Sequence, residues 1–115
     1  MAYIIADNII SPLGETSEEN YLSVKAGRSG IRTYEPGTCN IPEGFYASLL
    51  FEDFETLALR SAQKAIANAQ LELKGKRTAF ILSSTKGNIE ENISLADSAQ
   101  RIASQLGIDA KPIIV

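Results

Sequence analysis

The sequence predicts an α/β layered fold with a largely parallel sheet. The first reason is the order of elements that the residue pattern indicates: strand, helix, strand, helix, strand, helix and strand along 115 residues. Such alternation is typical of sheets covered by helices. The second reason is the segment Thr78–Ser83, which is apolar through its middle, as strands of parallel sheets tend to be. The third is the pair of segments Glu55–Gln70 and Ile89–Leu106, in which apolar residues recur at helical spacing.

The amino-terminal quarter of the chain is expected to form a strand and a helix. Tyr3–Ile10 is β-branched and apolar at both ends, which favours a first strand. The proline and glycine within Ser11–Gly14 end that strand. A helix then starts at Thr16 or Ser17 and stops at Gly27, because Thr16 has a glutamate three residues later, which is the spacing of a capping box.

The remaining elements follow from the same kind of pattern. Many alanines on one face of the second helix allow another element to approach it closely, and Gly107 ends the third helix. In order, we expect an irregular segment over Arg28–Gly44, a short strand over Phe45–Leu50, a helix over Glu55–Gln70, a turn at Lys74–Arg77, a strand over Thr78–Ser83, a loop at Ser84–Asn88, a helix over Ile89–Leu106 and a strand over Pro112–Val115.

Composition narrows the class of protein. The length suits one compact domain or part of a larger one, and the 44% hydrophobic and 22% charged residues are typical of globular proteins. The net charge of −3 gives no electrostatic reason to expect nucleic acid or an anionic membrane as partner. No apolar run has the roughly 20 residues of a membrane helix, and the start of the chain lacks the basic region of a signal peptide. We therefore expect a cytoplasmic protein.

Two residue counts restrict the possible chemistry. Cys39 is the single cysteine, so no internal disulfide can form, which fits a reducing compartment. Histidine is absent, so Ser-His and Cys-His nucleophile systems and imidazole zinc sites are excluded within this chain. We expect no catalytic, cofactor-binding or metal-ligating residue among these residues, and no cofactor.

The segment Ser83–Asn88 is the first candidate for ligand binding, because it lies between an expected strand and an expected helix and contains hydroxyls, Lys86 and Gly87. Backbone N–H groups at the start of a helix attract anions, so a phosphate-binding interpretation is open. The Walker spacing of glycines, lysine and serine or threonine is absent, however. The alternative is a strand-to-helix turn in which Gly87 supplies the geometry and Asn88 caps the helix.

The other chemistry-bearing residues also have a structural interpretation. Cys39 lies in a Pro/Gly-rich stretch without a histidine or a second cysteine, so we interpret it as a loop cysteine rather than a nucleophile. Carboxylates favour the positive end of a helix, which explains the acidic groups without acid/base or metal chemistry. A basic cluster after the first helix could contact an acidic partner such as a carrier protein, or remain a solvated surface. The acidic groups are Glu15, Glu18, Glu19, Glu90 and Glu91, and the basic cluster is Lys25, Arg28 and Arg32.

Three stretches in this order resemble the amino terminus of β-ketoacyl (3-oxoacyl) carrier-protein synthases of the thiolase-like superfamily. A first strand leads into the sequence IISPLG of residues 9–14, and the first helix ends in AGRSGI, residues 26–31. An alanine-rich helix then precedes AFILSSTKG, residues 79–87. Members commonly have glycines in the first strand, where this chain has Ala6, Asp7 and Asn8, so the subfamily stays open.

The resemblance implies a thiolase-like half-domain, which is a partial α-β-α layer structure incomplete at its carboxyl end. Residues 1–115 would then form one partial amino-terminal synthase domain. Family members bind an acyl chain on a cysteine that follows a strand, and two further residues, histidines or a histidine and an asparagine, assist the condensation. None of these residues lies between Met1 and Val115, and Cys39 matches no family motif. Pro112–Val115 resembles the strand before the nucleophile. We therefore expect the chain to be a fragment, because an apolar terminal strand also invites association.

The resemblance also implies an activity and partners. The parent enzyme would be an acyltransferase that catalyses decarboxylative Claisen condensation of acyl and malonyl thioesters in fatty-acid or polyketide-type biosynthesis. It would work with an acyl carrier protein and form a homodimer or heterodimer, while the 115-residue chain alone is expected to be inactive. Two other functions stay open: a small α/β module that binds a phosphate or nucleotide through Ser83–Asn88, and a non-catalytic partner subunit of a synthase.

Overall fold

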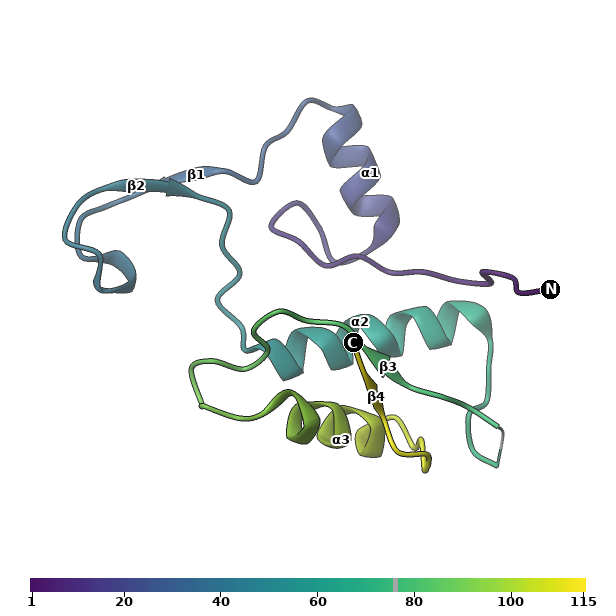
Figure 1. Ribbon diagram of the computed structural model, residues 1–115. Coiled ribbons are helices and arrows are strands. Elements are labelled where there is room, and N and C mark those ends of the chain that lie inside the picture. Colours follow the sequence, from purple (N-terminus) through teal and green to yellow (C-terminus); the bar gives the residue numbers. More distant parts are fainter. Residues whose placement is uncertain (76) are drawn as a thin grey trace. The chain divides into compact units, whose positions relative to one another are not determined.

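The protein is a mixed α/β chain whose contacts group it into two compact units. The computed structural model describes residues 1–75 and 77–115 (Figure 1). One unit comprises Asn8–Phe51 and is called here the 8–51 unit. The other comprises Met1–Asp7 with Glu52–Val115 and is called the 52–115 unit. Each unit is described by itself.

Helix α1, Ser17–Lys25, is the main element of the 8–51 unit and confirms the expected helix. Thr16 is its N-cap, and its hydroxyl oxygen accepts a hydrogen bond of 3.1 Å from the backbone N–H of Glu19. The Glu19 carboxylate in turn accepts from the N–H of Glu15 at 2.6 Å, one residue earlier than in the standard capping box. Gly27 follows the helix with φ +72°, a left-handed conformation that favours glycine.

The buried side of α1 is polar rather than apolar. Asn20 and Ser23 are its buried residues, and both bind the turn before the helix. The Asn20 amide donates to the carbonyl oxygens of Ile9 at 3.0 Å and Gly14 at 3.2 Å, and its oxygen accepts from the Ser11 hydroxyl. The Ser23 hydroxyl donates to a carbonyl of the same turn at 2.9 Å. Hydrogen bonds, and not burial of apolar surface, therefore hold α1 to the turn.

A two-stranded antiparallel hairpin completes the 8–51 unit. Strand β1, Arg32–Tyr34, pairs with β2, Phe45–Ala47, and a 3₁₀ turn, Thr38–Asn40, lies between them. The expectation that Arg28–Gly44 is irregular was therefore wrong over β1, because short strands without alternating polarity leave no periodic pattern. The strand expected over Phe45–Leu50 is present only as β2. The rings of Tyr34 and Phe45 stack across the hairpin with centroids 5.3 Å apart.

The strand expected over Tyr3–Ile10 is not formed, which corrects the first element of the sequence prediction. These residues have no helix or strand assignment, and Tyr3, Ile4 and Ile5 are exposed. Residue type favours a strand here, but a strand also needs a neighbouring backbone for its hydrogen bonds. Within residues 1–75 and 77–115 no strand pairs with this segment.

Two helices form the body of the 52–115 unit. Helix α2, Phe54–Ala69, confirms the expected helix, with Asp53 as N-cap and Gln70 in a left-handed C-cap conformation. Helix α3, Leu95–Gln105, begins six residues later than expected. The side chain of Ser94 accepts the N–H of Asp97 and fixes this start, while residues 89–92 form a turn and residues 93–94 belong to no helix or strand. The apolar spacing over residues 89–94 was misleading because it does not mark where a cap is satisfied.

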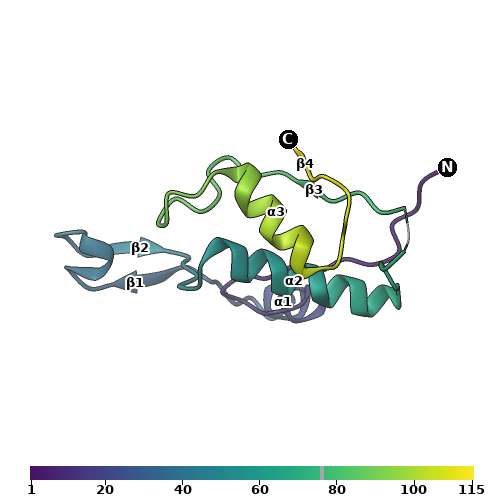
Figure 2. The same cartoon turned by 90° about the horizontal axis from the view of Figure 1, so that it is seen from below.

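Strands β3, Ile81–Leu82, and β4, Ile113–Ile114, pair in parallel, with Ile81 opposite Ile113 and Leu82 opposite Ile114. Both are shorter than the expected strands over Thr78–Ser83 and Pro112–Val115. Helix α3 connects them, so the segment is a strand–helix–strand crossover (Figure 2). Within residues 1–75 and 77–115 the expected parallel sheet is therefore present only as this pair, since the other sheet described there is antiparallel. A complete thiolase-like layer arrangement stays a prediction.

The core of the 52–115 unit is small and centred on α3. Small side chains allow α3 to lie close to its neighbours, and the helix packs against both α2 and β4. The fully buried Ser98 on this face donates a hydrogen bond of 2.7 Å to the carboxylate of Glu55 on α2. The buried apolar residues are Leu82, Ala99, Ile102, Ala103 and Ile108.

Candidate functional site

The loop that follows β3 is stabilised by its own hydrogen bonds. The Ser84 hydroxyl oxygen accepts the N–H of Gly87 at 2.9 Å. Gly87 has φ +63°, and a Cβ atom added there would lie 2.5 Å from Cδ2 of Leu95, so the position favours glycine. The Asn88 side chain is buried and donates to the Glu91 carboxylate at 3.3 Å. Ser84, Gly87 and Asn88 thus form a compact turn.

This loop does not lie at a free helix N-terminus. Asn88 was expected to cap the following helix, but Ser94 does so instead. The first turn of α3 already contains Asp97, which accepts the Ser94 hydroxyl at 2.8 Å and places a negative charge where an anion would bind. Lys86 is exposed on the loop. The geometry therefore gives no support to phosphate binding, and that interpretation stays a prediction.

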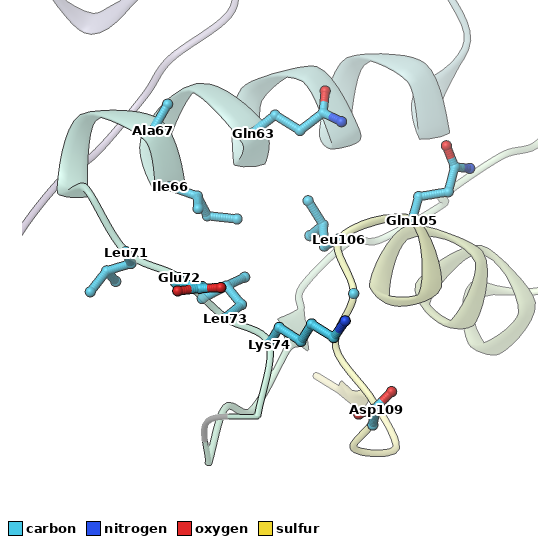
Figure 3. A pocket seen from close by; sticks show the side chains of 11 residues that line it. Gln63, Ile66, Ala67, Leu71, Glu72, Leu73, Lys74, Gln105, Leu106 and Asp109 are labelled. Carbon is cyan, nitrogen blue, oxygen red and sulfur yellow. The ribbon is translucent and has the colours of Figure 1, made fainter.

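A groove of about 560 Å³ lies between the carboxyl-terminal ends of α2 and α3. Figure 3 shows Ile66 of α2 and Leu106 after α3 facing each other across it, with Leu73 on the connecting segment below. Both helices end here in left-handed residues, Gln70 and Gly107, and the chain turns back at each. The lining consists of Gln63, Ile66, Ala67, Leu71, Glu72, Leu73, Lys74, Gln105, Leu106, Gly107 and Asp109.

The groove can accept an apolar group, and its lining contains no hydroxyl, thiol or imidazole nucleophile. Leucine and isoleucine side chains form its floor, while the charged groups of Glu72, Lys74 and Asp109 lie around them (Figure 3). None of the lining residues has a hydroxyl, thiol or imidazole group. The arrangement is typical of a binding surface rather than a catalytic centre. Sequence reasoning missed this groove, because its residues come from three separate segments; the helix-ending glycine at 107 was the only sequence indication of it.

A second, smaller cavity of about 200 Å³ brings the loop after β3 to the start of α2, and it is acidic. Its lining includes Glu52, Asp53 and Glu90. Arg60 donates two hydrogen bonds to Glu52, at 2.6 and 2.8 Å, and lowers the pKa of that carboxyl. Hydrogen bonds from Thr56 to Asp53 lower the pKa of Asp53 in the same way. Both carboxylates thus have structural partners that explain their position.

Cys39 lies in the 3₁₀ turn of the 8–51 unit, where it is exposed and free. Its backbone is left-handed, with φ 53°, and Asn40 beside it is left-handed as well. A nucleophilic cysteine needs a base or a cation to favour its thiolate. No described hydrogen bond or ion pair of this thiol supplies one, so the geometry agrees with the interpretation of a loop cysteine.

The other charged candidates lie on surfaces. Glu18 and Glu19 occupy the first turn of α1, where acidic groups favour the helix dipole, and Lys25 is in its last turn. The Lys25 amino group lies 5.7 Å from the centre of the Tyr21 ring. All of the expected acidic residues and the whole basic cluster are exposed: Glu15, Glu18, Glu19, Glu90, Glu91, Lys25, Arg28 and Arg32. Glu19 and Arg28 line a surface cavity of about 430 Å³ beside α1, and Glu90 lines the acidic cavity described above.

Comparison with known proteins adds no assignment, since no family model, curated protein or solved structure matches this chain. None of the helices in residues 1–75 and 77–115 is both long enough and apolar enough to cross a membrane. Over the same residues, His, Cys, Asp and Glu side chains form no group of three that could hold a metal ion.

Proposed function

We propose that these residues form the amino-terminal part of a β-ketoacyl carrier-protein synthase, an acyltransferase that condenses acyl and malonyl thioesters. The proposal rests on the resemblance of three sequence stretches to that family, in the order in which the family has them. The chain's own residues supply part of the scaffold and no reacting group, because histidine is absent and Cys39 lies in a surface turn.

The parallel pairing of β3 with β4 is the observation that supports this proposal best. The N–H of Val115 donates to the carbonyl of Leu82 at 3.0 Å, so both strands end at the same edge of the sheet. In α/β folds, ligands bind where the carboxyl ends of parallel strands meet. A residue that follows β4 would emerge beside the loop that begins at Ser83. A nucleophile in that position agrees with the role proposed for the parent enzyme.

Exposed apolar side chains on this strand pair also favour a larger sheet. Ile81, Ile113 and Val115 are 60%, 51% and 73% exposed. Apolar strand surface of this kind is usually covered by protein, and unpaired strand edges invite association. We propose that further sheet structure covers it in the parent enzyme, and that β4 contributes to its dimer.

The coding sequence downstream of Val115 tests the proposal directly. We expect a cysteine among small residues within about ten positions, at a turn comparable to other strained strand-to-helix elbows, and histidines much later. A reading frame that stops at Val115 would overturn the proposal. A reading frame that continues without a cysteine at that turn would instead favour the alternative function, a non-catalytic synthase subunit.

Activity measurements complete the test. The full translation product should release carbon dioxide and form a 3-oxoacyl thioester from an acyl thioester and a malonyl carrier protein, whereas residues 1–115 alone should not. Substitution of the downstream cysteine by alanine should abolish condensation, and Cys39→Ala should leave it unchanged. Loss of activity in a folded Cys39→Ala variant would show that the proposal is wrong in assigning the nucleophile to a cysteine downstream of Val115.

A further inference from the structure

Helix α1 has an inverted distribution of polarity. Its buried residues are the polar Asn20 and Ser23, while Tyr21 and Leu22 are 61% and 52% exposed. Burying one face of a helix against a polar turn leaves the apolar residues on the opposite face. An exposed apolar stripe of this kind on a short surface helix is a candidate contact surface.

The exposed stripe has opposite charges at its two ends. Residues three, four and seven apart share one face of a helix, so Glu18, Tyr21, Leu22 and Lys25 lie in one row. Seven residues span about 10 Å along a helix, which places the carboxylate and the ammonium on either side of the two apolar residues. The contact between Lys25 and the ring of Tyr21, with 5.7 Å from Nζ to the ring centre, keeps the ammonium over the stripe.

We propose that this stripe is a self-association surface on which the α1 helices of two copies of the chain pack antiparallel. With a two-fold axis between Tyr21 and Leu22, Glu18 of each copy lies opposite Lys25 of the other. The same axis places each Tyr21 opposite the other copy's Leu22. An isologous contact needs this kind of self-complementary patch, in which residue i contacts j and j contacts i.

The charges favour a second copy over other occupants. The row is neutral, with one carboxylate and one ammonium, and in an antiparallel copy each of them lies opposite a group of the other sign. An acidic protein partner would leave Glu18 opposed by like charge, and an anionic membrane surface would be repelled by Glu18 and the adjacent Glu19. Two helices of nine residues bury less than the roughly 1,200 Å² of stable interfaces. We therefore expect a weak dimer in rapid exchange.

Charge reversal tests the proposed pairing. Wild-type chain should show concentration-dependent dimerisation by sedimentation equilibrium up to about 1 mM, as expected for a small interface. Glu18→Lys and Lys25→Glu should each weaken dimerisation by about tenfold or more, because two attractions become two repulsions. The double variant should dimerise like wild type. Matched controls are Glu43→Lys and Lys86→Glu, which make the same charge changes at exposed positions that do not belong to α1.

Mixing the two single variants is the decisive measurement. In a mixed dimer each charge at position 18 again lies opposite the other sign at position 25, so an equimolar mixture of Glu18→Lys and Lys25→Glu chains should recover wild-type association, although each variant alone associates about tenfold more weakly or less. Circular dichroism of each variant checks that α1 is still folded. A monomeric wild-type chain, an unchanged dimer in both single variants, or no recovery in the mixture or in the double variant would each overturn the pairing.

This surface is formed by a different element from the strand edge in the proposed synthase dimer, because α1 belongs to the 8–51 unit and β4 to the 52–115 unit. Ile114→Lys should disrupt association along β4. Dimerisation through α1 should still depend on the charges at positions 18 and 25 as it does in the wild-type chain. If Ile114→Lys abolishes all association of a folded chain, the α1 pairing is refuted, whatever the downstream sequence shows about the synthase.

Discussion

The hydroxyl of Ser98 donates a hydrogen bond of 2.7 Å to the carboxylate of Glu55, forty-three positions earlier in the chain. Ser98 is fully buried on α3, and Glu55 lies in the first turn of α2. Arg101 approaches the same carboxylate at 3.7 Å. A serine at the centre of an otherwise apolar face thus fixes how the two helices pack, because a buried carboxylate oxygen without a donor is unfavourable.

The first prediction concerns this contact. Ser98→Ala should lower the free energy of unfolding by about 1–2 kcal/mol, because the Glu55 oxygen loses its serine donor in a part-buried contact. Chemical denaturation of the chain measures the change. Ser104→Ala, on the exposed side of the same helix, is the matched control and should be nearly neutral. Equal effects of the two substitutions would show that the hydrogen bond is unimportant.

The second prediction concerns Asn20. Asn20→Ala should destabilise α1 by about 2–3 kcal/mol, since several backbone carbonyls of the preceding turn and the Ser11 hydroxyl lose their partner together. Amide hydrogen exchange within residues 17–25 reports the loss. Asn68→Ala makes the same change at an exposed helical position and should leave this exchange unaltered. Unchanged protection of α1 in Asn20→Ala would refute the proposed role of the amide.

The third prediction concerns Gly87. Ala at this position must adopt φ +63° and place its Cβ 2.5 Å from Leu95. The conformation costs about 1–2 kcal/mol and the overlap about 1–3 kcal/mol more. Gly107→Ala has a similar φ of +75° with no atom within 4 Å, so it isolates the conformational part, and Gly87→Ala should be the more destabilising in thermal denaturation.

Removing the overlap provides a further check of the third prediction. In a Leu95→Ala background, the destabilisation caused by Gly87→Ala should fall close to that caused by Gly107→Ala. The reason is that the leucine methyl groups that the new Cβ would meet are gone. If Gly87→Ala remains as much more destabilising than Gly107→Ala in that background as in the wild-type chain, contact with Leu95 is not the cause of the difference.

The fourth prediction is a pH dependence at the start of α2. Hydrogen bonds from Arg60 and Thr56 lower the pKa values of Glu52 and Asp53 from 4.5 and 3.8. A lowered folded-state pKa contributes stability above the unfolded value that is lost as pH falls through the folded value. The free energy of unfolding should therefore decline as pH falls from about 5 to 3.

A variant of Asp53 distinguishes the contribution of this cap to the pH dependence of stability from that of the other carboxyl groups. Asp53→Asn keeps a capping oxygen but cannot ionise, so its stability should fall less steeply over the same pH range than that of wild type. Asp109→Asn removes one charge at an exposed position and should preserve the slope. A wild-type slope in Asp53→Asn would contradict a contribution from this cap.

Local patterns predicted the elements that are stabilised within their own segments. Helices α1 and α2 are present because their caps, Thr16 and Asp53, lie immediately before periodic sequences. Gly107 ends α3 as expected, with φ +75° and a hydrogen bond of 2.9 Å from Ile108 back to Ala103. The candidate site could not be predicted from local patterns, because the groove between α2 and α3 is formed by residues far apart in the chain.

The sequence alone determined the cap of α1 at Thr16, the helix-ending turns at Gly27 and Gly107 and the absence of a histidine base within these residues. Tertiary structure decided which apolar segments became strands: Ile81–Leu82 pairs with β4, whereas the equally β-prone Tyr3–Ile10 pairs with no strand in the part of the chain that the structure describes. It also decided that α1 would bury Asn20 and expose Tyr21. The physical reason is that a helix cap is satisfied by residues next to it in the sequence. Strand pairing and the choice of the buried helix face depend instead on which other backbone segment comes close.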